Sequence, residues 1–112
     1  MHELSIAQSI FKTVLGEMEK NQVKSVEKIG LRIGKLSGIL PDALEFSFDA
    51  IKSDTALAQT TLEMEIVPIQ GKCHDCEETF TVEDFIFACP HCSSGHIEIE
   101  RGQELEIAYL EV

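Results

Sequence analysis

Cations are scarce in this sequence, which has 9 Lys and Arg against 20 Asp and Glu and a formal net charge of −11. Residues 1–69 carry 7 basic and 10 acidic residues, a net charge of −3, whereas residues 70–112 carry 2 and 10, a net charge of −8. Proteins that bind nucleic acid need cations to displace the counterions of phosphate. We therefore expect no nucleic-acid partner, and the acidic surface favours a cationic ligand or a basic partner protein.

Long apolar runs are also missing, since no stretch approaches about 18 continuous apolar residues, the length of a membrane-spanning helix. The N-terminal region has no basic segment followed by an apolar one, as a signal peptide would. These absences predict a cytoplasmic protein that contacts no membrane and keeps its thiols reduced.

Familiar catalytic motifs are absent as well. The sequence has no G-x-S-x-G nucleophile turn, no phosphate-cradling glycine loop and no H-E-x-x-H metalloprotease motif. We therefore expect no enzymatic activity.

All 4 cysteines lie in one stretch, as the pairs Cys73/Cys76 and Cys89/Cys92. A C-x-x-C turn directs two sulfurs to a point about 2.3 Å from a metal, and two such turns complete a tetrahedron. The spacing predicts one structural zinc ion in a closed four-thiolate site, in preference to a disulfide or a redox dithiol. A thioredoxin-like role requires a C-x-x-C at a helix start within a β-α-β pattern, which is missing here.

Three histidines lie in or near this stretch. His74 and His91 fall inside the two C-x-x-C turns, and His96 follows Ser94-Gly95. Because four thiolates already fill a tetrahedron, we interpret His74 and His91 as groups that surround the zinc site or face solvent. Their protonation near neutral pH could tune the site. His96 is interpreted as a loop residue.

The remaining sequence predicts a small α+β fold with two helices on one face of a three-stranded sheet. The first helix spans residues 3–20, and the second begins at Pro41, which suits a first helical turn, and ends at residues 52–54. Strands are predicted at residues 28–33 and 61–66, and a closing strand or hairpin around Gly102. The apolar positions of the first helix recur at helical spacing: Leu4, Ala7, Ile10, Phe11, Val14, Leu15 and Met18.

The zinc-ribbon-like unit of two C-x-x-C knuckles is an insertion between two strands of this fold. We assign residues 70–96 to a zinc-binding domain and residues 1–69 plus 97–112 to the α+β domain. Within the inserted unit we expect Phe80, Phe85, Ile86 and Phe87 to form a small apolar cluster. Such a short segment needs the metal to fold.

The first three residues, Met1-His2-Glu3, form a second candidate metal site. With His at position two, the terminal amine, the His2 amide nitrogen and the His2 imidazole can chelate one ion in a planar array. That geometry suits Ni(II) or Cu(II) far better than zinc. A fourth ligand could come from Glu3, through its amide or its carboxylate, or from another side chain. The alternative interpretation is that His2 is a solvated terminal residue.

Taken together, these motifs make the chain resemble the HypA/HybF family of nickel metallochaperones. The resemblance rests on Met1-His2-Glu3-Leu4-Ser5, on Ile33-Gly34 followed by Ser37-Gly38, and on the C-x-x-C and C-P-x-C pairs, in a chain of this size. It implies a nickel site that uses His2 and the N-terminal backbone, and a structural zinc held by Cys73, Cys76, Cys89 and Cys92.

The resemblance also implies partners. These are a HypB-like GTPase and the large subunit of [NiFe]-hydrogenase, to which nickel is delivered, with the chaperone itself a monomer or weak homodimer. Some family members are thought to use an acidic ligand just after the first strand, where Asp42 is the nearest carboxylate here. We interpret Asp42 instead as a residue that caps or flanks the second helix. The alternative function is a structural zinc-ribbon adaptor that binds a protein partner and no second metal.

Overall fold

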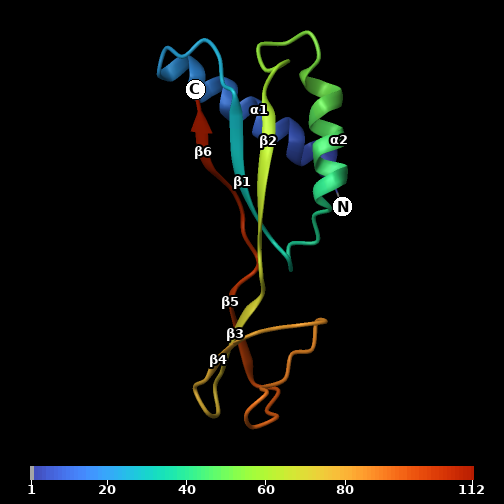
Figure 1. The fold of residues 1–112 in the computed structure, drawn as a ribbon, viewed down its shortest axis with the longest axis vertical. Helices are drawn as coiled ribbons and strands as arrows, with labels where there is room; N and C mark the ends of the chain where they lie inside the picture. The colour runs from blue at the N-terminus through green and yellow to red at the C-terminus, as the bar shows by residue number, and fades with distance from the viewer. Residues whose placement is uncertain (1) are drawn as a thin grey trace.

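The computed structural model describes residues 2–112, so the expectation for Met1 lies outside the described residues. The chain forms two three-stranded sheets at the two ends of an elongated molecule of 54 × 25 × 16 Å (Figure 1). Among residues 2–112, no helix has the length and hydrophobicity needed to cross a membrane. The elements are α1 (Glu3–Lys20), β1 (Lys28–Gly34), α2 (Pro41–Lys52), β2 (Thr61–Val67), β3 (Gln70–Cys73), β4 (Thr79–Thr81), β5 (Ile97–Arg101) and β6 (Leu105–Glu111).

Both predicted helices are confirmed. Helix α1 buries Ala7, Ile10, Val14 and Met18, which lie three or four residues apart and so form one stripe. Helix α2 has Pro41 in its first turn, where a missing N–H costs nothing, and it buries Leu44 and Phe48. The two stripes pack together with the first sheet into one hydrophobic core.

The first sheet has the strand order β2-β1-β6, with β1 parallel to β2 and antiparallel to β6. The buried side chains of Ile29, Leu31 and Ile33 alternate along β1 and face the helices. On the opposite face, Arg32 forms ion pairs with Glu65 of β2 and Glu106 of β6. The predicted layer of two helices on a three-stranded sheet is therefore confirmed.

The second sheet has the order β4-β3-β5 and carries the cysteine-rich segment. β5 pairs with β3, from Cys73 opposite Ile97 to Gln70 opposite Arg101, whereas β6 belongs to the first sheet. The segments on either side of Gly102 therefore do not form a hairpin with each other. Instead the chain leaves the first sheet at β2 and returns to it at β6 (Figure 1).

The two sheets meet at a tightly packed junction of Gly34, Ile69 and Gly102. The Gly34 amide donates to the carbonyl of Glu104 at 2.7 Å, and the Leu36 amide donates to the carbonyl of Gly102 at 2.7 Å. A Cβ atom on Gly34 would lie 2.0 Å from the Gly102 carbonyl oxygen, and Gly102 has a φ of +117°. Only glycine fits at these two positions, because the backbones of the two segments lie in close contact there.

One expectation for the inserted unit is wrong. We expected Phe85, Ile86 and Phe87 to join Phe80 in an apolar cluster, but these three side chains are 55%, 63% and 38% exposed. The buried apolar side chains of the unit are instead those of Val82, Cys73 and Cys89, and Ile69 is buried just before the unit begins. Because Asp84 and Phe85 both have positive φ values, the chain turns there and carries the following side chains outward.

Candidate metal centres

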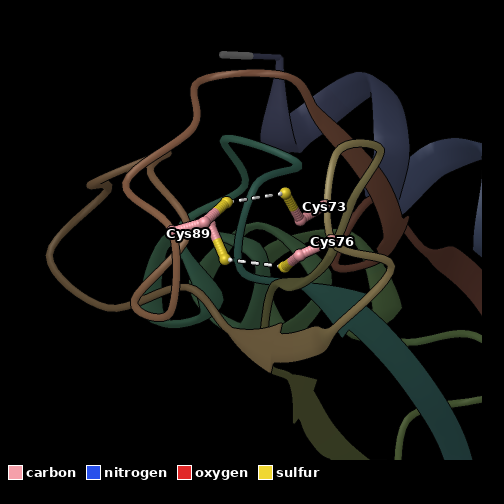
Figure 2. Close-up of side chains that lie close together, drawn as sticks. Cys73, Cys76 and Cys89 are labelled. Carbon is pink, nitrogen blue, oxygen red and sulfur yellow. Dashed lines mark hydrogen bonds between the residues drawn. The ribbon is translucent and has the colours of Figure 1, made fainter.

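The four cysteine sulfurs converge at the far end of the second sheet. Their sulfur atoms all lie within 4.8 Å of one another, and no other described residue joins this group. Sγ of Cys73 lies 3.5 Å from that of Cys92, and Sγ of Cys76 lies 3.5 Å from that of Cys89. Figure 2 shows the sulfurs pointing toward a common centre, with Cys73 at the end of β3 and Cys89 in the loop between β4 and β5.

The two C-x-x-C turns have the same backbone geometry. The carbonyl of Cys73 accepts from the amide of Glu77 at 2.8 Å, and the carbonyl of Cys89 accepts from that of Ser93 at 2.8 Å. Glu77 and Ser93 both have a φ of 63°. In addition, the amide of His91 donates to the sulfur of Cys89 at 3.4 Å. The two knuckles therefore present their sulfurs in equivalent ways.

This arrangement fits a tetrahedral metal. Four sulfurs at about 2.3 Å from a zinc ion are about 3.8 Å apart, close to the observed separations, whereas a disulfide requires about 2.05 Å. All four cysteines are free, with Cys73 and Cys89 buried. Four ligands close the coordination shell and leave no position for water or substrate, so the cluster suits a structural role.

The electrostatics of the cluster favour a bound cation. Backbone N–H groups of Cys76 and Asp75 point at Cys73 and lower the pKa of its thiol to about 6. The Glu78 amide also favours a thiolate at Cys76, but burial and the neighbouring sulfurs outweigh it and raise the pKa of Cys76 to about 12. Without a metal, a thiolate at Cys73 therefore makes it harder for Cys76 to lose its proton. A divalent ion removes this conflict by stabilising all four thiolates.

The histidines lie outside the sulfur cluster, in agreement with the interpretation given to His74 and His91. His74 Nε2 is 3.7 Å from a carboxylate oxygen of Glu98, and His96 Nδ1 is 3.4 Å from one of Asp75. Asp75 also accepts a hydrogen bond from the hydroxyl of Ser94. The contacts of Asp75 thus join the first knuckle to the segment that follows the second, whereas the His74–Glu98 pair joins the first knuckle to β5.

His2 and Glu3, at the start of α1, lie at the helical end of the molecule, away from the second sheet that carries the cysteine-rich segment (Figure 1). His2 is the exposed N-cap residue of α1, and its carbonyl accepts from the amide of Ile6 at 3.0 Å. His2 and Glu3 line an open hollow of about 680 Å³ between the starts of α1 and α2, together with Asp42. The structure thus places His2, Glu3 and Asp42 around one hollow, and this hollow is separate from the cysteine cluster.

Glu3 has a second role that sequence reasoning missed. Its carboxylate accepts a hydrogen bond from the amide of Leu40 at 3.2 Å, and this contact, followed by its own backbone amide, lowers the pKa of Glu3. Asp42 lies in the first turn of α2, as interpreted, and also faces the hollow that contains His2. In the sequence, Glu3 and Asp42 could be recognised only as acidic residues in the first turns of two helices. Their position at the same hollow results from the packing of α1 on α2.

Comparison with known proteins places these sites in context. A family model described as "Hydrogenase/urease nickel incorporation, metallochaperone, hypA" matches residues 1–112. The chain is 38% identical over 112 residues to a hydrogenase maturation factor HypA of Desulfitobacterium hafniense, covering 100% of this chain and 98% of that protein. It is 41% identical over 112 residues to a HypA of Roseiflexus sp., covering 99% and 91%.

Two solved structures share the fold. A solution structure of a HypA protein superimposes with a TM-score of 0.74 at 23% identity, covering 99% of this chain and 95% of the other. The solution structure of the Ni metallochaperone HypA from Helicobacter pylori gives 0.69 at 23% identity, covering 99% and 97%.

Proposed function

Because this chain belongs to the HypA family of nickel metallochaperones, we propose that it binds its nickel cargo through His2 at the start of α1. It is a nickel metallochaperone of hydrogenase maturation rather than an enzyme. In the proposed site the His2 imidazole and amide nitrogen act with the terminal amine of Met1, and Glu3 contributes its backbone amide. The observation that carries this proposal is the hollow shared by His2, Glu3 and Asp42.

The surroundings of His2 suit a site that releases its metal. The N-termini of α1 and α2 both lie at the hollow, and the positive end of a helix dipole disfavours a cation. The carboxylates of Glu3 and Asp42, one in each first turn, offset this effect. A carrier must release its metal, and an affinity of about micromolar strength, near −8 kcal/mol, would suit that role.

The Glu3 carboxylate supports the site in another way. Since it is already bonded to the amide of Leu40, it fixes the first turn of α1 against the loop that leads into α2. We therefore assign the side chain of Glu3 to positioning His2, and its backbone amide to the metal.

We further propose that Cys73, Cys76, Cys89 and Cys92 hold one structural zinc ion. The supporting facts are the convergent sulfurs and the equivalent knuckles. In the domain division we propose, residues 70–96 form the zinc-binding domain, and the pairing of β5 with β3 supports extending it to Arg101. Residues 1–69 with the C-terminal strand form the nickel-binding domain.

A role in hydrogenase maturation implies maturation partners. We propose that these are a HypB-like GTPase and the hydrogenase large subunit, met by the chaperone as a monomer or weak homodimer in the cytoplasm. The four cysteines form no disulfide bond, which is consistent with that compartment.

The decisive experiment is a calorimetric titration of untagged protein with nickel. The zinc content is measured in parallel. Wild type should bind about one nickel in addition to about one zinc. His2→Ala should lose the nickel and keep the zinc, whereas His91→Ala, the matched control, should keep both. Residues added before Met1 should also weaken nickel binding. If His2→Ala bound nickel as tightly as wild type, the proposed site would be wrong.

A further inference from the structure

The three consecutive apolar residues Phe85, Ile86 and Phe87, which we call the apolar turn, are not used by either metal site. Their side chains are 55%, 63% and 38% exposed, although Val82 just before them is buried at 3%. Three neighbouring large apolar side chains in water are unfavourable, at about 25 cal/mol for each Å² left exposed. Single exposed apolar residues are common, but three consecutive ones are a reason to look for an interaction site.

The backbone at the start of the apolar turn also works against this exposure. The amide of Ile86 donates to the carbonyl of Glu83 at 3.0 Å, which closes a turn with Asp84 and Phe85 at its centre. These two residues have φ values of 52° and 56°. Asparagine and glycine adopt this region readily, but a phenylalanine there costs about 1–2 kcal/mol. The turn thus carries Phe85 outward at a conformational cost, with no packing gain inside the protein to offset it.

The charge around the apolar turn defines what it can bind. Glu83 and Asp84 precede it directly, and the sequence between Lys72 and Arg101 contains no lysine or arginine. An acidic rim repels nucleic acid, anionic membranes and a second copy of this acidic chain. The acidic rim attracts cationic groups, and the apolar centre favours apolar contacts. A protein segment that is both basic and amphipathic offers the two together.

We propose that the apolar turn is a docking surface for a basic, amphipathic segment of a partner protein. Apolar side chains of that segment cover Phe85, Ile86 and Phe87, and its lysines or arginines face Glu83 and Asp84. The proposal is independent of nickel binding at His2, because the turn belongs to the zinc-binding end of the molecule (Figure 1).

The test uses the full-length, zinc-loaded protein and three fluorescein-labelled peptides of equal length. The first has lysines and leucines arranged as an amphipathic helix, the second has its leucines replaced by serines, and the third has its lysines replaced by glutamates. Binding is measured by fluorescence anisotropy at low and high salt. We expect the first peptide to bind at least about tenfold more tightly than either of the others.

The decisive variant is Phe85→Ser/Ile86→Ser, with Ile66→Ser/Val112→Ser as the matched control because those side chains are also exposed, at 46% and 72%. The turn variant should lose about tenfold or more in affinity for the first peptide. The control pair should lose less than about twofold, and Glu83→Gln/Asp84→Asn should remove most of the salt dependence. Retention of zinc by each variant verifies that the unit is folded.

Three results would overturn the proposal. Equal affinity of wild type and Phe85→Ser/Ile86→Ser would mean that the peptide responds only to overall charge. Concentration-dependent dimerisation in sedimentation, lost in that variant, would make a second copy the occupant. Binding of wild type, but not the variant, to vesicles of phosphatidylglycerol would make the occupant a membrane.

Discussion

The carboxylate of Glu3 accepts a hydrogen bond from the amide of Leu40, with 3.2 Å between Oε2 and the nitrogen. Glu3 is the first residue of α1, and Leu40 is the N-cap residue of α2. One side chain therefore joins the starts of the two helices at the point where His2 enters the fold. The precision of the proposed nickel site depends on this contact.

Replacement of Glu3 should weaken nickel binding without affecting zinc. In Glu3→Ala the first turn of α1 loses its attachment to Leu40, so His2 is less well positioned. We expect a loss of about tenfold in nickel affinity, the lower end of the effect of groups that orient metal ligands. Calorimetric titration measures it. Glu19→Ala, an exposed substitution at the other end of α1, should change nothing.

A paired test of two glycines separates close packing from helix propensity. A Cβ atom on Gly30 would lie 2.1 Å from the ring of Tyr109, whereas one on Gly16 would meet no atom within 4 Å beyond its chain neighbours and the backbone of its own helix. Gly30→Ala should destabilise the protein by about 1–3 kcal/mol, because the Tyr109 ring must move. Gly16→Ala, in exposed helix, should stabilise it by about 0.5–1 kcal/mol. Thermal unfolding measures both, and equal effects would contradict the structure.

Acid should destabilise the first sheet through Glu63. The hydroxyl of Tyr109 donates to the Glu63 carboxylate and, followed by the charge of Lys28, lowers the pKa of Glu63 below its ordinary value of 4.5. A carboxyl with a lowered folded-state pKa stabilises the fold above its unfolded-state pKa, and this stabilisation is lost as pH falls through the folded value. The unfolding midpoint of wild type should therefore fall more steeply below pH 4.5 than that of Tyr109→Phe. Parallel profiles for the two proteins would exclude this role.

Metal removal should unfold one end of the molecule and leave the other folded. The second sheet has strands of only 3–5 residues, and structural zinc contributes an apparent binding free energy of about 10–16 kcal/mol to such units. After chelation, or in Cys76→Ser, we expect the amides of β3 to lose protection from hydrogen exchange. The amide of Leu31 in β1 is the internal control and should remain protected. Simultaneous loss at both ends would mean that the two units unfold together.

The sequence predicted the elements whose signal is local. Helix α1 was predictable because its apolar residues repeat at helical spacing over five turns, and the cysteine cluster because each C-x-x-C turn is a local structure. β3 escaped prediction because Gln70-Gly71-Lys72 has no alternating apolar pattern. The separation of β5 from β6 depends on partners far away in the chain, which spacing does not reveal.

The candidate sites follow the same division. His2 and the four cysteines could be named from short motifs, whereas the contact of Glu3 with Leu40 requires residues 37 positions apart to meet. The exposure of Phe85, Ile86 and Phe87 was not predicted because large apolar residues usually lie inside a protein. It accompanies a turn with positive φ values, which the sequence pattern does not indicate.

The placement of β6 has a consequence for the order of events during synthesis. β6 pairs with β1 along most of its length but follows the cysteine-rich segment in the chain, so β1 remains an unprotected edge until that segment has left the ribosome. If zinc binds to the cysteine-rich segment first, the chain between β2 and β6 is already compact. The entropic cost of pairing β6 with β1, which are far apart in the sequence, is then lower. The supply of zinc would then affect how fast the half that contains the proposed nickel site folds.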